Sequence, residues 1–299
     1  MVQNFITRSQ RALFARTLIC LVTAALAACS AARLGYGNGE FLSYWWLDSY
    51  VDFDAAQQPW VKQRIADLFA WHRTTQLTNY SRLLLLEQDR LRHEVSTADV
   101  LASYDEFKAR AATLVDRLLP DLAELALRLR PQQIAHIEEK FKSNSESFRK
   151  EYVRGDVQQR QRFRYKKALE QAEYWFGDFS SEQQRAIRIA SDARPLNNEM
   201  WMADHLHRQS ELIALLRKIE AEKPARDVVI ALLRRYLDVN YFSHSAKPEF
   251  NAFFQEYRAG SAGLTALIVN LATPAQRARA NQKVQQWIDD FTLLAGHTS

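Results

Sequence analysis

The segment Pro131-Gln132-Gln133-Ile134-Ala135-His136-Ile137-Glu138-Glu139-Lys140-Phe141 shows a pattern that runs through most of this chain. Its apolar residues Ile134, Ile137 and Phe141 are three and four residues apart, which is the spacing of one face of an amphipathic helix. Residues 61–72 have the same spacing, and no segment alternates as a half-buried strand does. We therefore predict an all-α protein, either a multi-helix bundle or a stack of antiparallel helices.

The same periodicity, read along the whole chain, predicts ten helices joined by short connections. They cover residues 55–75, 77–94, 97–129, 131–153, 156–176, 181–193, 197–222, 225–240, 247–270 and 274–295. Pro120 is expected to kink or split the third helix. No linker rich in Pro, Gly or Ser interrupts this region, so we predict one helical domain over 54–299 with a seam near 193–195.

Four of the predicted helix starts carry a glutamine three residues after the expected N-cap. The cap and glutamine pairs are Asp54 with Gln57, Arg130 with Gln133, Ser180 with Gln183, and Thr273 with Gln276. A Ser, Thr or Asp cap can accept a hydrogen bond from the amide of the glutamine, whose side chain can bond back to the amide of the cap. Arg130 has no acceptor atom, so the second start is expected to lack this cap.

This repeat has a second interpretation. It resembles the Leu-Thr-x-x-Gln signature of the small periplasmic stress chaperones of the Spy type, which are helical and hold unfolded clients on a concave surface. No copy in this chain contains Leu-Thr in full, and the glutamines are unevenly spaced at 57, 133, 183 and 276. Ordinary helix capping therefore accounts for most of the pattern, and a displayed client-binding repeat is the alternative.

The N-terminus resembles a bacterial lipoprotein signal. Arg8, Arg11 and Arg16 precede an apolar stretch too short to span a bilayer, and this stretch ends in Leu26-Ala27-Ala28-Cys29. The resemblance implies recognition of Leu26, Ala27 and Ala28, removal of residues 1–28, and lipidation of Cys29. Ser30 then implies the periplasmic face of the outer membrane as the destination. In the alternative, an ordinary secretory signal, Cys29 would be incidental.

Composition excludes several classes of function. Removing residues 1–28 takes three arginines and no acid, so the net charge of +5 falls by 3 to +2, and we expect no nucleic-acid partner. Cys20 lies in the signal and Cys29 carries the lipid, which leaves no thiol for a disulfide, a zinc site or nucleophilic catalysis. No cofactor motif is present, so none is predicted.

Residues 29–53 are expected to form an aromatic-rich anchor segment. Its aromatic residues Tyr44, Trp45, Trp46 and Tyr50 form a candidate interface, which either meets lipid headgroups or packs as a hydrophobic plug on the end of the bundle. Together with Tyr36-Gly37-Asn38 and Trp71-His72-Arg73, this segment resembles an uncharacterised family of proteobacterial lipoproteins, the domain-of-unknown-function family 6279. The resemblance implies a class and a location, and it carries no activity.

One local excess of positive charge stands out in the predicted helix 156–176. Arg160, Arg164 and Lys167 share a helix face and could bind lipopolysaccharide phosphates, anionic lipid or an acidic partner. In the alternative they form a solvated face that is partly neutralised by Glu170 and Glu173.

Candidate catalytic and metal-binding groups are poorly spaced. His205 and His207 point about 200° apart on a helix, unlike the i, i+4 pair that binds zinc, so no metal site is predicted. His136, Glu138 and Glu139 are the least unfavourable catalytic candidates. Glu138 and Glu139 splay apart on a helix and are a poor acid–base couple, whereas His136 and Glu139 are better spaced but typical of a solvated salt bridge. We therefore expect a membrane-tethered binding, scaffold or chaperone-like envelope protein, whose partner is an envelope protein or an unfolded client. An enzyme acting on peptidoglycan or lipid is the alternative.

Overall fold

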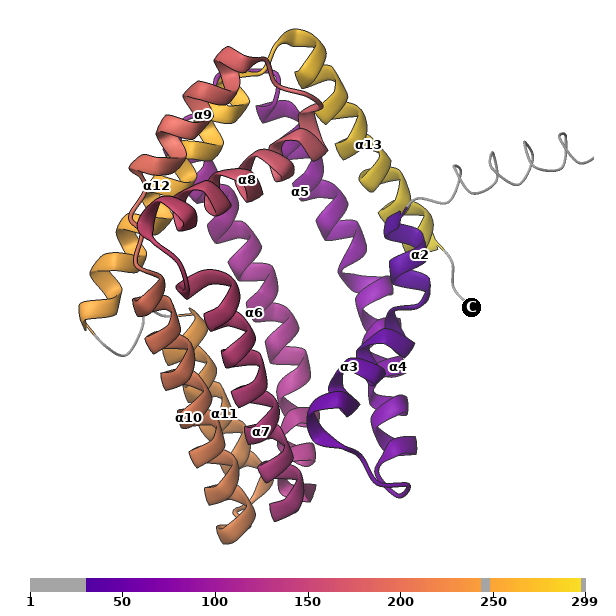
Figure 1. Cartoon of the computed structure of the whole chain (residues 1–299). Coiled ribbons are helices and arrows are strands. Elements are labelled where there is room, and N and C mark those ends of the chain that lie inside the picture. The colour runs from indigo at the N-terminus through magenta and orange to yellow at the C-terminus, as the bar shows by residue number, and fades with distance from the viewer. Residues whose placement is uncertain (1–30, 243–247, 297–299) are drawn as a thin grey trace, which may run out of the picture.

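A computed structural model describes residues 31–242 and 248–296 of the chain, and every regular element in these residues is helical (Figure 1). The elements are α2 (Ala31–Gly37), α3 (Gly39–Val51), α4 (Gln58–Thr75), α5 (Leu77–Arg90), α6 (Thr97–Arg128), α7 (Pro131–Phe148), the π-helical η1 (Arg149–Val153), α8 (Val157–Phe176), α9 (Ser181–Ala193), α10 (Asn198–Glu222), α11 (Arg226–Leu237), the π-helical η2 (Asp238–Phe242), α12 (Pro248–Leu271) and α13 (Pro274–Gly296). The prediction of an all-α protein is confirmed.

All ten predicted helices are present, and two features differ from expectation. The aromatic segment 29–53 contains two helices, α2 and α3, which backbone bonds from Asn38 to Leu34 and from Leu42 to Asn38 join almost continuously. Pro120 does not split α6, which runs unbroken over 32 residues. We attribute this continuity to packing, because α10, α11 and α12 all contact α6 and outweigh the loss of one backbone hydrogen bond.

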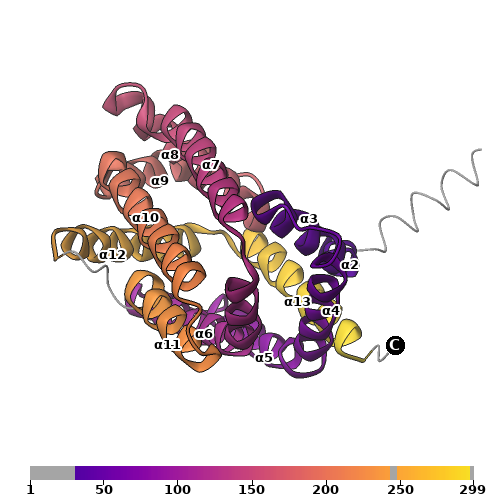
Figure 2. The ribbon, with the colours of Figure 1, turned by 90° about the horizontal axis from the view of Figure 1, so that it is seen from below.

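Two hydrophobic cores hold the helices together. The first contains buried residues of α3, α4, α6, α7, α10 and α11, and the second contains buried residues of α8, α9, α12 and α13. In Figures 1 and 2, α5 lies against α13, and α9 lies against α12. The connection at residues 193–195 joins α9 of the second core to α10 of the first. The chain therefore passes between the cores more than once and does not complete one before it begins the other.

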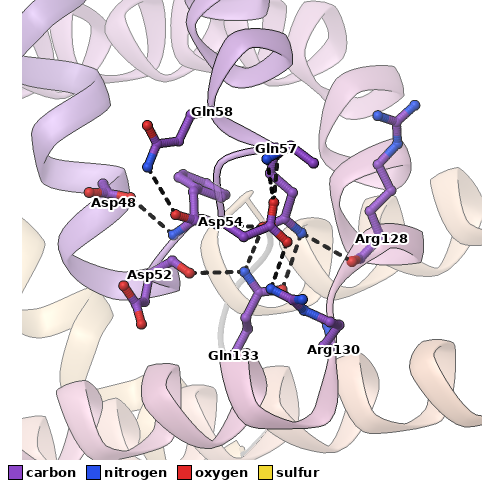
Figure 3. A network of polar contacts seen from close by, with 10 residues as sticks. Asp48, Asp52, Asp54, Gln57, Gln58, Arg128, Arg130 and Gln133 are labelled. Carbon is purple, nitrogen blue, oxygen red and sulfur yellow. Dashed lines mark hydrogen bonds and ion pairs between the residues drawn. The ribbon is translucent and has the colours of Figure 1, made fainter.

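The four glutamine-bearing turns meet in two pairs. In the first pair, the Gln57 and Gln133 side chains bond to each other, with amide-to-carbonyl distances of 3.2 and 2.7 Å (Figure 3). Gln57 Nε2 also donates to the carbonyl of Arg128 at 3.2 Å, and Gln133 Nε2 donates to the carbonyl of Asp52 at 3.1 Å. We call this arrangement the first junction. It joins the α3–α4 turn to the α6–α7 turn.

The second junction repeats this geometry between the α8–α9 and α12–α13 turns. Gln183 and Gln276 bond to each other at 2.9 and 3.4 Å. Gln183 donates to the carbonyl of Leu271, and Gln276 donates to the carbonyl of Asp178, both at 2.7 Å. In both junctions each glutamine therefore bonds the backbone carbonyl that lies five residues before its partner. The junctions lie at opposite ends of the molecule in Figure 1.

The predicted capping boxes are confirmed at three of the four turns. Asp54, Ser180 and Thr273 accept from the amides of their glutamines at 2.8, 3.2 and 3.3 Å. Arg130 makes no side-chain cap, as expected, although its amide still donates to Gln133 Oε1 at 3.2 Å. Its guanidinium instead pairs with Asp54 at 2.6 Å across the first junction. The turn that departs from the capping pattern is thus bonded to the cap of its partner turn.

Candidate functional site

An exposed apolar stripe runs along α2 and α3. It consists of Leu34, Phe41, Leu42, Trp45 and Trp46, and we call it the α2–α3 face. The spacing of these residues places them on one side of a nearly continuous helix. Phe41, Trp45 and Trp46 are 67%, 63% and 57% exposed, which is unusual for a cluster of large aromatic side chains. The stripe begins shortly after Cys29. That cysteine, like Leu26, Ala27 and Ala28, lies outside the described residues.

The four aromatic residues expected at the interface separate into two groups. Trp45 and Trp46 belong to the exposed face, whereas Tyr44 and Tyr50 pack against the first core. The Tyr44 ring stacks on Phe53 at 6.3 Å between centroids. The Tyr50 hydroxyl accepts a hydrogen bond from Asn144 at 2.6 Å. Both expected arrangements, an exposed surface and a packed plug, are therefore present on the same helix, and they meet where the Trp46 ring lies 4.9 Å from the Tyr50 ring.

A second candidate site is a groove that lies beside α8. It is a cavity of about 700 Å³, and its lining includes all three predicted anion-binding residues, Arg160, Arg164 and Lys167. Arg154 and Arg194 add two further cationic side chains, and Glu151 is the one acidic side chain in the lining. We call it the basic groove. Its volume lies within the range of small-molecule sites, about 300–1,000 Å³.

Hydrogen bonds to the backbone hold Arg164 in place in the groove. Arg164 Nη1 donates to the carbonyl of Pro195 at 2.7 Å, and Nη2 donates to that of Arg194 at 3.1 Å. Burial and the neighbouring Arg194 guanidinium lower the pKa of Arg164, and burial lowers that of Arg194. Both groups stay charged at neutral pH because arginine titrates far above this range. The groove thus holds two adjacent, partly desolvated positive charges.

Two of the other cations of the groove pair with acidic side chains. Arg160 pairs with Glu199 at 2.7 Å, and Lys167 lies 3.5 Å from Glu170. Arg154 is exposed at the rim. The Nε atoms of Arg160 and Arg164 are buried and have no hydrogen-bond partner within the described residues. Glu170 therefore partly neutralises Lys167, as the sequence predicted. The groove as a whole keeps an excess of positive charge.

Aromatic rings form the walls of the groove. Phe148 and Tyr152 stack at 4.8 Å, and Phe163 contacts Tyr152 edge to face at 5.4 Å. On another side, the Trp201 ring lies 5.3 Å from the Tyr257 ring. These two residues also line a neighbouring cavity of about 560 Å³. Sequence reasoning missed the contributions of Arg194, Trp201 and Tyr257, because they come from elements that approach α8 only in the folded chain.

Two histidines, His72 and His205, pack against aromatic rings. His72 is half-buried among Tyr36, Trp71 and Tyr80, and its Nδ1 lies 3.0 Å from the Tyr36 hydroxyl. His205 stacks on Phe148 and bonds Gln209 at 2.8 Å through Nε2. Burial lowers the pKa of both histidines. Within the described residues no three His, Cys, Asp or Glu side chains are grouped so that they could hold a metal ion.

The catalytic candidates on α7 do not converge. His136, Glu138 and Glu139 are all exposed, and none of them lines either cavity described above. His136 Nε2 lies 3.3 Å from the carbonyl of Ser49, and Glu138 pairs with Arg217 at 2.5 Å. These contacts attach α7 to its neighbours α3 and α10. They are the contacts of surface residues between packed helices.

Comparison with known proteins assigns the chain to a family. Residues 49–235 match the model of a family of unknown function (DUF6279), and this match contains the whole first junction and most of the residues of the basic groove. No curated protein and no solved structure matches the chain significantly. In the described part of the chain, no helix has both the length and the apolar character needed to cross a membrane. Because the match covers well over half of its length, the chain belongs to the DUF6279 family.

Proposed function

We propose that this protein is a lipid-anchored envelope component that lies on the periplasmic face of the outer membrane and acts there as a binding or scaffold protein. The observation that carries the proposal is the α2–α3 face, an exposed apolar stripe that begins five residues after Cys29. A lipid on Cys29 would hold this stripe at the membrane surface, where Trp is favoured among the headgroups.

The surroundings of the α2–α3 face fit this orientation. The stripe itself has no Lys or Arg, but Lys62 of α4 lies 4.6 Å from the Tyr44 ring centroid, and Lys140 of α7 lies 5.6 Å from that of Tyr50. Two positive charges therefore flank the helix that carries the stripe, where they can attract anionic headgroups. Asp48 faces the protein, because its carboxylate accepts a hydrogen bond from the amide of Phe53 at 3.0 Å.

Fractionation of cells tests the anchor. With Cys29→Ala, we expect the protein to move from the membrane to the soluble periplasm, since none of its described helices can span a bilayer. If the alanine variant stayed on the membrane after a carbonate wash, the lipid anchor would be the wrong explanation.

Vesicle flotation tests the α2–α3 face separately. We expect the soluble chain, residues 30–299, to float with vesicles that contain anionic phospholipid, and Trp45→Ser with Trp46→Ser to weaken this binding strongly. The matched control is Phe107→Ser with Ile189→Ser, which removes two apolar side chains that are 70% and 72% exposed on α6 and α9. Equal losses in both double variants would show that the face has no special role.

A chaperone-like role is the second candidate, and the exposed aromatics of the α2–α3 face favour it. The glutamine turns do not support it, because the residue four positions before each glutamine is buried: Phe53, Leu129, Phe179 and Ala272. A holdase of this kind should suppress aggregation of an unfolded protein at near-stoichiometric ratio, and Trp45→Ser with Trp46→Ser should reduce that protection without lowering stability. Equal aggregation with and without the protein, over several clients, would eliminate this role.

A further inference from the structure

We propose that the basic groove binds a phosphate ester that has an apolar body, with the phosphate held by the cations along α8 and the apolar body against the aromatic walls. The groove carries an excess of positive charge, because its lining contains five cations, Arg154, Arg160, Arg164, Lys167 and Arg194, and one acid, Glu151. Glu199 and Glu170, outside the lining, pair with Arg160 and Lys167 and leave the other three cations in excess. This inference goes beyond the proposed membrane tether and does not depend on it.

The geometry of the cations favours a compact, multiply charged anion. Arg164 and Arg194 are adjacent and partly buried: Arg164 donates to the carbonyls of Arg194 and Pro195, and Arg194 donates to that of Ser191. Two like charges held this close disfavour each other until an anion lies between or beside them. The Nε atoms of Arg160 and Arg164 are buried without a hydrogen-bond partner in the described residues, so the hydrogen bonds of both guanidinium groups are incomplete. Phosphate oxygens are strong acceptors for guanidinium groups, and both arginines line the cavity.

The apolar walls distinguish this groove from a simple anion site. Phe148, Tyr152 and Phe163 form one continuous cluster of rings, and Trp201 with Tyr257 forms another. None of these five side chains is exposed, yet all of them reach the cavity surface. An inorganic anion would leave these walls in contact with water, whereas the acyl or other apolar part of a phosphate ester would cover them. A lipid headgroup and a soluble phosphate ester share this chemistry.

Isothermal titration of the soluble chain, residues 30–299, with two probes separates the two sources. The probes are glycerol 3-phosphate and dihexanoyl phosphatidic acid below its micellar concentration. We expect both to bind, with phosphatidic acid binding more tightly by roughly tenfold or more because its chains cover the aromatic walls. Equal affinities would show that the aromatic walls do not bind an apolar body and would contradict the proposal.

Charge-matched variants locate the site. Arg154→Gln with Lys167→Gln removes two cations from the groove, and we expect a loss of affinity of roughly tenfold or more for both probes. The control is Arg162→Gln with Lys166→Gln, which removes the same charge at two exposed residues of α8 outside the groove lining. Circular dichroism checks that both variants keep the fold. All four substituted side chains are exposed, so we expect no loss of helix.

Three further results would overturn the proposal. These are no binding of either probe, equal losses in the groove and control variants, and tighter binding of a polyglutamate peptide than of both phosphate esters. The last result would assign the groove to an acidic protein segment.

Discussion

The two glutamine junctions share one geometry but differ in burial and in charge. In each junction, the two glutamine side chains bond each other. Each glutamine also donates to the backbone carbonyl that lies five residues before the other glutamine. In the first junction Gln133 is buried, and the ion pair between Asp54 and Arg130 joins the two caps (Figure 3). In the second, both glutamines are partly exposed, and the hydroxyls of Ser180 and Thr273 form the caps. The repeated unit is therefore a pair of turns. A turn that lacks its own side-chain cap, such as the one at Arg130, is held by an ion pair with the cap of its partner turn.

Removing a glutamine should break the first junction more severely than the second. We expect Gln133→Ala to lower the free energy of unfolding by about 2 kcal/mol, because it removes a buried side chain together with its bonds to the Asp52 carbonyl, the Arg130 amide and the Gln57 side chain. Gln276→Ala should lower it by about 1 kcal/mol, because water can reach the groups that it releases. Urea unfolding of the soluble chain measures both. The reverse order would contradict the difference in burial.

The caps should rank by the number of contacts that each one makes. Asp54→Ala should cost about 1–2 kcal/mol, since it removes both a cap and the ion pair with Arg130. Ser180→Ala and Thr273→Ala remove a cap alone and should each cost about 1 kcal/mol. Arg130→Ala should cost less than about 1 kcal/mol, because the guanidinium is 54% exposed and the ion pair is screened by water. Thermal and urea unfolding rank the four variants. A cost for Arg130→Ala above that of Asp54→Ala would contradict the cap assignment.

The smallest expected effect is a difference in response to acid. His72 and His205 lie on α4 and α10, which contribute to the first core, whereas α8, α9, α12 and α13 contain no histidine. Burial lowers the pKa of both histidines in the folded state, so the unfolded chain binds protons more readily. Stability should therefore be highest above the ordinary histidine value of about 6.5 and should fall as the pH drops through it.

His72→Gln tests this response. The variant should lose less stability between about pH 7 and pH 5 than the unaltered protein, because one proton-binding group of the unfolded chain is absent. The control is His93→Gln, which alters an exposed histidine outside both cores. An unchanged pH dependence in His72→Gln would show that burial of this ring does not affect its protonation.

The sequence predicted most of the helices because periodicity and caps are local signals. The α2–α3 helices were missed because Gly35, Gly37 and Gly39 weaken helix propensity, and because the apolar stripe of this segment faces outward, where burial cannot be inferred from spacing. Helical spacing did predict that Arg160, Arg164 and Lys167 share a face. The remaining groove residues, such as Trp201 and Tyr257, lie on other helices and were not accessible to local reasoning.

The pairing of the glutamines also required the fold. Each cap and glutamine obeys the same local rule, and nothing in the spacings 76, 50 and 93 indicates which turn bonds which. Arg130 was the one informative departure, because an arginine cannot cap and must find an acceptor elsewhere. Its acceptor is Asp54, the cap of the turn to which Gln133 is bonded.

Pairing of the four turns is the central structural claim, and double-mutant cycles test it most directly. We expect the alanine variants of Gln57 and Gln133 to be non-additive by about 1 kcal/mol in the free energy of unfolding, and those of Gln183 and Gln276 to be non-additive in the same sense. A cross-pair cycle of Gln57 with Gln276 should be additive within about 0.5 kcal/mol. Additivity within both pairs, or equal coupling across them, would contradict the pairing and would reduce the repeat to four independent helix caps.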